Sequence, residues 1–76
     1  MKPEIALSYS KLWKTLLDKH MNKTQLHEKA EISTNAVAKM SKNEPVSLDT
    51  IAKVCVALDC KIEDVVEIII EDIDIK

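Results

Sequence analysis

The apolar positions of this 76-residue chain fall into short segments with helical spacing. The widest segment lies near the N-terminus and contains Tyr9, Leu12, Trp13, Leu16 and Leu17. Residues three or four positions apart share one face of an α-helix, so this stripe predicts a helix that buries one side. Ser8 or Ser10 is expected to cap the helix, which ends near residues 19–20.

Two further helix signals are separated by very few residues. Asn22 is a preferred N-cap, and Gln25 stands three positions later, where its side chain can complete a capping box. Ser33 offers a second cap. The pattern predicts helices over 22–30 and 33–41 with a turn of about three residues between them. Two capped helices around such a turn match the helix-turn-helix motif, whose second helix can lie in the major groove of DNA.

The next part of the chain predicts two more helices. Pro45 marks a break, because proline pushes the preceding residue out of helical space, and Ser47 then caps a fourth helix. A short fifth helix is expected over 62–67. The apolar face expected for the fourth helix consists of Leu48, Ile51, Ala52, Cys55 and Leu58.

Both ends of the chain alternate between apolar and other residues. The alternating positions are Ile5, Leu7 and Tyr9 at one end, and Ile68 with Ile70 and Ile73 with Ile75 at the other. A period of two suggests short strands, which pair either with each other or with another copy of the chain. Because a lone two-stranded ribbon is marginal in water, it needs helices beneath it or a partner. The tail from Val65 to Ile75 is therefore expected either to form a dimer surface or to cover its own core.

The chain contains no glycine. Many helices end with a left-handed residue, which is usually glycine. The residues that follow the predicted helices here are His20, Glu31, Asn43 and Asp59. Asn, Asp and His tolerate a positive φ best, so we expect positive φ at some of these positions, with Glu31 the most strained.

Charge is unevenly distributed along the sequence. Residues 1–43 contain eight lysines and four acidic residues, a balance of +4, whereas residues 44–76 contain three lysines and nine acidic residues, a balance of −6. This asymmetry suggests a basic working face and an acidic face turned away from phosphate. Two solvated faces without a role would give the same count.

Composition indicates one globular domain over residues 1–76, with 46% hydrophobic and 32% charged residues. No apolar run approaches the roughly 18 residues of a membrane span, and the N-terminus is unlike a secretory leader, so a cytoplasmic protein is expected. Cys55 and Cys60 lack the C-x-x-C spacing and are expected to be reduced, buried thiols.

Neither metal chemistry nor catalysis is indicated. His20 and His27 do not combine with the cysteines in a zinc-ligand spacing. The adjacent acidic pairs at 63–64 and 71–72 point in different directions on a helix, and no nucleophile has a partnering base. We therefore expect no enzyme activity, no metal and no cofactor.

Several short motifs carry a family resemblance from Tyr9 to about Glu67. These are Leu12-Trp13-Lys-Thr-Leu-Leu-Asp-Lys, Met21-x-Lys-Thr-x-Leu26, Ile32-Ser33, Ala38-Lys39, Val46-Ser47-Leu48, Cys55-x-x-Leu58-x-Cys60 and Asp64-Val65-Val66-Glu67. In this order and spacing they resemble the short single-domain Cro/phage-repressor-type (XRE-like) helix-turn-helix transcriptional regulators of bacteria and phages. The resemblance implies an all-α, five-helix, lambda-repressor-like fold with the helix-turn-helix at 22–42.

The resemblance also implies which residues meet DNA. The base-reading positions are Thr34, Asn35, Lys39 and Lys42. The phosphate-binding positions are Lys23, Ser33 and Asn43. Two residues depart from the family pattern: His27 stands where helix two usually has alanine, and Glu31 stands where the turn usually has glycine.

These observations predict a sequence-specific regulator that binds double-stranded DNA as a homodimer and has no effector domain or membrane contact. The alternative is a protein-interaction module of the same fold, an antitoxin or co-regulator, that acts through the acidic C-terminal half.

Overall fold

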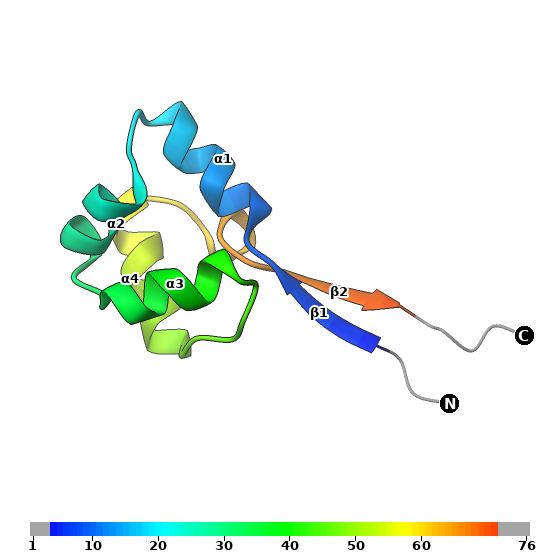
Figure 1. Ribbon diagram of the computed structural model, residues 1–76. Helices are drawn as coiled ribbons and strands as arrows, with labels where there is room; N and C mark the ends of the chain where they lie inside the picture. Colours follow the sequence, from blue (N-terminus) through cyan, green and yellow to red (C-terminus); the bar gives the residue numbers. More distant parts are fainter. Residues whose placement is uncertain (1–3, 72–76) are drawn as a thin grey trace, which may run out of the picture.

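A computed structural model describes residues 4–71 and shows a cluster of four short α-helices from which a two-stranded ribbon projects (Figure 1). The elements are β1 (Glu4–Ser8), α1 (Ser10–Asp18), α2 (Lys23–Ala30), α3 (Thr34–Ser41), α4 (Leu48–Leu58), a 3-10 turn (Ile62–Asp64) and β2 (Glu67–Glu71). None of the helices in this part of the chain is long and apolar enough to cross a membrane.

Side-chain caps start three of the four helices, as the sequence predicts. Asn22 Oδ1 accepts a 2.8 Å hydrogen bond from the backbone N–H of Gln25, whose Oε1 accepts a 2.9 Å bond from the N–H of Asn22. The Oγ atoms of Ser33 and Ser47 each accept a bond from the N–H three residues later, at 3.0 and 3.1 Å. These bonds satisfy backbone donors that the first helical turn leaves free, so they fix where α2, α3 and α4 begin.

The expected serine cap on α1 is wrong. Tyr9 occupies the N-cap position and makes no side-chain cap. Its ring is buried instead, and its hydroxyl donates a 2.8 Å hydrogen bond to the backbone carbonyl of Glu44. Burial raises the pKa of Tyr9, so the hydroxyl stays protonated and remains a donor. The start of α1 is therefore fixed by a tertiary contact.

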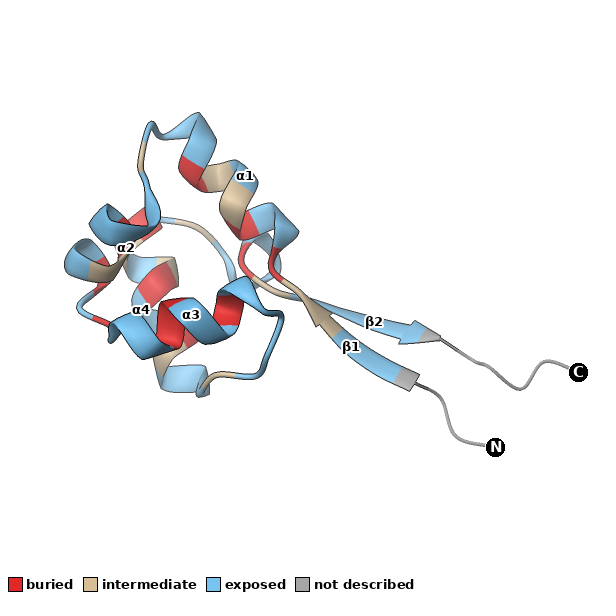
Figure 2. Cartoon of the chain, viewed as in Figure 1, coloured by how far each residue is buried: buried red, intermediate tan, exposed pale blue. Residues whose placement is uncertain are grey.

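One apolar core joins the four helices. Its largest fully buried side chains are Tyr9, Leu12, Leu26, Met40, Val54, Leu58 and Val65. Figure 2 shows buried residues in each of the four helices, interspersed with exposed ones. Three predicted core residues are wrong, since Leu17 is 75% exposed, Leu48 is 70% exposed, and Ala52 on α4 is also exposed. Leu17 lies at the edge of the α1 stripe, and Leu48 is the first residue of α4, at the end of its buried face.

The predicted fifth helix is also wrong. Residues 62–64 form a single 3-10 turn, and the chain is extended from Glu67 onward. Branched residues dominate this segment, and they favour strands because their side chains lose freedom in a helix. Val65 between the two elements is fully buried, so this part of the tail covers its own core. The fold is therefore mostly helical with a small sheet, rather than all-α with five helices.

The first and last elements of the described residues pair with each other. β1 and β2 are antiparallel, with Ile5 opposite Ile70 and Leu7 opposite Ile68. Of the two pairings that the alternation left open, the intramolecular ribbon is the one present. The alternating pair Ile73 and Ile75 lies outside the described residues.

All four helices end through the same left-handed turn, although the chain has no glycine. The φ angles of His20, Glu31, Asn43 and Asp59 are 57°, 56°, 59° and 53°. The sequence predicts positive φ at some of these positions, and it occurs at all four. In each case the N–H of the following residue donates to the carbonyl five positions earlier, at 2.9 to 3.2 Å. This 6→1 bond is that of the Schellman motif, so backbone geometry rather than residue type defines these helix ends.

The cysteines differ from their expected burial. Cys55 and Cys60 are free thiols, but both are half-buried rather than buried. Burial, with smaller contributions from the nearby Cys55 and Asp64, raises the pKa of Cys60. Its thiol is therefore protonated at neutral pH, which makes it a weak nucleophile.

The left-handed conformation of Glu31 leads to a stability prediction. Replacing Glu31 with glycine should raise the free energy of unfolding by about 1 kcal/mol, because glycine adopts positive φ without the clash of a Cβ atom. Urea denaturation followed by circular dichroism measures the change. Glu31→Ala is the matched control, since it also removes the carboxylate at the end of α2 but keeps the Cβ. If the glycine variant is no more stable than the alanine variant, strain at this position is not the cause.

Candidate nucleic-acid interface

Helix α3 has two distinct sides. Its buried residues are Ala36, Val37 and Met40. Its exposed residues are Thr34, Asn35, Ala38, Lys39 and Ser41. At about 100° per residue the buried set occupies an arc of roughly 100°, and the exposed set occupies the arc opposite. In Figure 2, buried and exposed residues alternate along the ribbon of α3. The helix is thus packed along one edge and free along the other.

The turn between α2 and α3 holds the two helices together without the family's usual residues. His27 is half-buried, and its Nδ1 hydrogen-bonds to the carbonyl of Ile32 across the turn. A carbonyl only accepts, so Nδ1 carries the hydrogen in this arrangement. Ile32 itself is buried in the core. His27, which stands where the family usually has alanine, therefore stabilises the turn through this hydrogen bond instead of pointing outward into solvent.

Three predicted base-reading residues lie on the free side of α3. Thr34, Asn35 and Lys39 are exposed, and Lys42 is exposed at the C-cap of the same helix. Within residues 4–71 the only ion pair joins Lys53 to Asp49, at 3.5 Å, so Lys39 and Lys42 are not neutralised by an acidic partner there. Their charges are available to a ligand.

Two small hollows flank α3 and divide the predicted residues between them. Asn35 and Lys39 line a hollow of about 190 Å³ together with Ser33, Ser47 and Thr50. This hollow lies where α3 and α4 both begin. On the other side of α3, Thr34 lines a hollow of about 290 Å³ with Lys23 and His27 from α2. The structure thus brings Lys23 and the α3 residues onto one surface.

Lys23 is held in position by contacts with two other helices. Its Nζ donates a 2.9 Å hydrogen bond to Ser41 Oγ at the end of α3 and lies 4.4 Å from the centroid of the Trp13 ring on α1. A lysine over an indole face is attracted to it electrostatically. The ammonium group is therefore pre-positioned beside α3 while its side chain stays exposed.

The other two predicted phosphate ligands have internal roles. Ser33 Oγ caps α3. Asn43 Oδ1 accepts a 3.3 Å bond from the backbone N–H of Tyr9, and Asn43 also has the left-handed φ that ends α3. Both side chains are exposed. These hydrogen bonds within the protein neither support nor contradict a phosphate contact, so phosphate binding by Ser33 and Asn43 stays a prediction.

Ser47 and Thr50 were not predicted to belong to this surface. Their hydroxyls are 2.9 Å apart and line the same hollow as Asn35 and Lys39. The sequence identifies Ser47 as the cap of α4 but carries no signal that α4 begins beside α3. That proximity arises only from tertiary packing.

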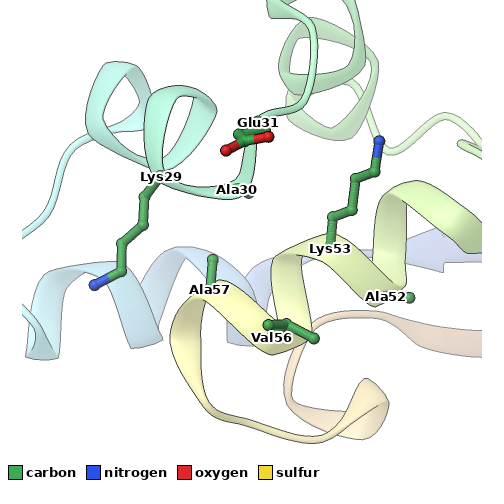
Figure 3. A pocket seen from close by; sticks show the side chains of 7 residues that line it. All are labelled: Lys29, Ala30, Glu31, Ala52, Lys53, Val56 and Ala57. Carbon is green, nitrogen blue, oxygen red and sulfur yellow. The ribbon is translucent and has the colours of Figure 1, made fainter.

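A separate hollow of about 330 Å³ lies between the end of α2 and α4, and Figure 3 shows the side chains around it. Its floor is formed by alanines and Val56, and its charged side chains, Lys29, Glu31 and Lys53, stand at the rim. No group of three or more potential metal ligands occurs in residues 4–71.

Comparisons with known proteins agree with this geometry. A family model for Cro/C1-type helix-turn-helix DNA-binding domains matches residues 11–71. The crystal structure of the transcriptional regulator VanUg (Form II) is similar, with 40% sequence identity, a TM-score of 0.83, and coverage of 88% of this chain and 89% of that chain. A search of curated proteins found no match. The resemblance noted from the sequence motifs is confirmed, and the chain belongs to the family of Cro/C1-type helix-turn-helix DNA-binding domains.

Proposed function

We propose that this protein is a sequence-specific transcriptional regulator that reads double-stranded DNA with the exposed side of α3. The proposal rests mainly on the exposed polar side of α3, which is formed by Thr34, Asn35 and Lys39. Lys39 has no acidic partner within the described residues, and the helix packs against the core only along its opposite side. A helix exposed in this way fits the width of the major groove.

The chemistry of these side chains suits base edges. The amide of Asn35 can pair with adenine through N6 and N7, and the ammonium group of Lys39 can donate to guanine O6 and N7. Thr34 offers a methyl group for thymine or a hydroxyl for a phosphate. Lys42 extends the positive charge to the C-terminal end of α3.

Phosphate contacts would fix the register of α3 in the groove. Lys23 lies beside α3, and the starts of α3 and α4 share one hollow, where the positive ends of the two helix dipoles favour anions. Ser33 and Asn43 are further candidates in this role. If one copy neutralises about three phosphates, the logarithm of the binding constant falls with the logarithm of salt concentration at a slope near −3.

Reading a specific site would use two copies. A protomer with one recognition helix reads only a few base pairs, and two-fold regulators of this kind bind half-sites about one DNA turn apart. Homodimerisation on DNA is part of the proposal. Residues 4–71 are used by the helix cluster and ribbon, so no effector-binding domain contributes from this part of the chain.

Base reading by Asn35 and Lys39 can be tested by substitution. Asn35→Ala and Lys39→Ala should each weaken operator binding by about 1–3 kcal/mol, because each removes a contact to base edges. The double variant should therefore lose at least about 30-fold in affinity. Both residues are exposed, so the free energy of unfolding should change by less than about 0.5 kcal/mol. The operator is first selected from random duplexes, and affinity is measured by fluorescence anisotropy.

Lys61→Ala is the matched control for Lys39→Ala, since it removes an exposed lysine next to the 3-10 turn, outside α3. It should bind the operator within about twofold of the native protein. Unchanged DNA affinity in the Asn35 and Lys39 variants would contradict the proposal. If a charge substituted at Ile68 then removed regulation, the protein-interaction module would be the correct reading.

A phosphate contact by Lys23 can be tested in the same way. Lys23→Met should weaken binding to all duplexes about equally and make the salt slope shallower by about 1, because a phosphate contact carries no sequence information. Trp13 is the only tryptophan, so its fluorescence should change when DNA draws the ammonium group away from the ring. That fluorescence change should be absent in Lys23→Met. A salt slope equal to that of the native protein would show that Lys23 does not bind phosphate.

A further inference from the structure

One face of the β1–β2 ribbon consists entirely of aliphatic side chains. Ile5 lies opposite Ile70, and Leu7 lies opposite Ile68. Residues directly opposite in antiparallel strands share a face, as do residues two apart along a strand. Ile5, Ile68 and Ile70 are 68%, 65% and 64% exposed, and Leu7 is half-buried against the helical core. We call these four residues the aliphatic face.

The opposite face of the ribbon is different in character. There Ala6 lies opposite Ile69, and Ser8 lies opposite Glu67. Ile69 is only 42% exposed, and Glu67 is exposed. The face that contains Ser8 and Glu67 is thus suited to contact with water. The aliphatic face exposes more apolar surface than that face does, and it has no polar side chain.

The helical part of the protein covers Leu7 in part but leaves the other three residues of the aliphatic face mostly exposed. The ribbon projects away from the helix cluster, and the chain measures 46 Å along its longest axis against 23 and 17 Å across (Figure 1). Figure 2 shows the outer part of both strands exposed. A two-stranded ribbon is marginal in water unless something packs on one face. A cover over the exposed part of this face would therefore stabilise the ribbon.

We propose that the cover is the aliphatic face of a second copy of this chain, so that the two ribbons stack face to face across a two-fold axis. Two identical aliphatic faces complement each other without leaving a buried donor, acceptor or charge unpaired. At the spacing of stacked sheets, about 10 Å, the isoleucines of the two copies interdigitate. Glu67 stays in water because it lies on the outer face of each ribbon.

The charge of the ribbon favours a second copy over a membrane surface. β1 and β2 have the sequences Glu-Ile-Ala-Leu-Ser and Glu-Ile-Ile-Ile-Glu, with acidic residues and no lysine. Anionic lipids attract basic segments and repel acidic ones. An aliphatic face on strands whose only charges are acidic is thus suited to a protein partner rather than to an anionic membrane. The same face of another copy is a partner that matches it across a two-fold axis.

The contact between the two ribbons is small, and this limits the affinity of the dimer. Four side chains from each copy form less surface than the 1,200–2,000 Å² of a standard stable interface. The dimer is therefore weak in free solution and is reinforced when two half-sites hold the copies together, because a shared duplex raises their effective concentration. The stacking itself does not require DNA, so it can be tested independently of the proposed function.

Sedimentation equilibrium of the full chain without DNA, from about 10 µM to about 1 mM, tests this inference on the concentration scale of weak complexes. The native protein should show a reversible monomer–dimer equilibrium. Ile70→Lys should weaken it at least 10-fold, because it places a charge in the aliphatic face. Ile69→Lys is the matched control on the same strand but the opposite face, and it should shift the equilibrium by less than about twofold.

Two results would overturn the inference. One is a native protein that stays monomeric over the whole concentration range. The other is an Ile69→Lys variant that weakens the dimer as much as Ile70→Lys does. Circular dichroism should show equal helix content in both variants, since neither residue belongs to the helical core.

Cross-linking covers the case in which a lysine simply separates the two strands. In a Cys55→Ser, Cys60→Ser background, Ile70→Cys should give a covalent dimer with a bismaleimide that spans about 10 Å, and Ile69→Cys should not. Equal cross-linking of both variants would contradict face-to-face stacking. Co-sedimentation of the native protein with anionic vesicles, lost in Ile70→Lys, would identify a membrane as the true partner.

Discussion

The orientation of α3 depends on the burial of one arc of its side chains. Ala36, Val37 and Met40 enter the core shared by all four helices, and their burial leaves only one side of α3 free. A helix of eight residues is too short to be stable alone in water, so this packing also supplies most of its stability. The position of the polar arc in space is therefore set by apolar contacts on the other side of the same helix.

Much of the fold is encoded locally and was predictable from the sequence. Asn22, Ser33 and Ser47 fix the starts of three helices through short-range bonds, and the residues after each helix adopt the expected left-handed conformation. The predictions failed where tertiary contacts decide the outcome. Tyr9 replaces a serine cap because its ring is buried, and the segment after residue 64 extends because it pairs with β1.

The candidate site shows the same division. The sequence identified the exposed residues of α3 because they follow a cap and alternate with apolar positions. It could not show that Lys23 reaches Ser41 and Trp13, since these contacts join three different helices. Nor could it show that Ser47 and Thr50 lie beside Asn35, because their proximity depends on how α4 crosses α3. Residue chemistry was predictable, whereas the grouping of residues from different helices was not.

The buried tyrosine at the base of the ribbon has a mechanical consequence. Tyr9 follows β1 directly, its N–H is bonded to Asn43, and its hydroxyl is bonded to the carbonyl of Glu44, so both bonds end just beyond α3. The ribbon therefore cannot swivel relative to α3 without breaking two hydrogen bonds and exposing an aromatic ring. In a dimer joined through the ribbons, the rigid connection at Tyr9 would fix the distance and the angle between the two α3 helices.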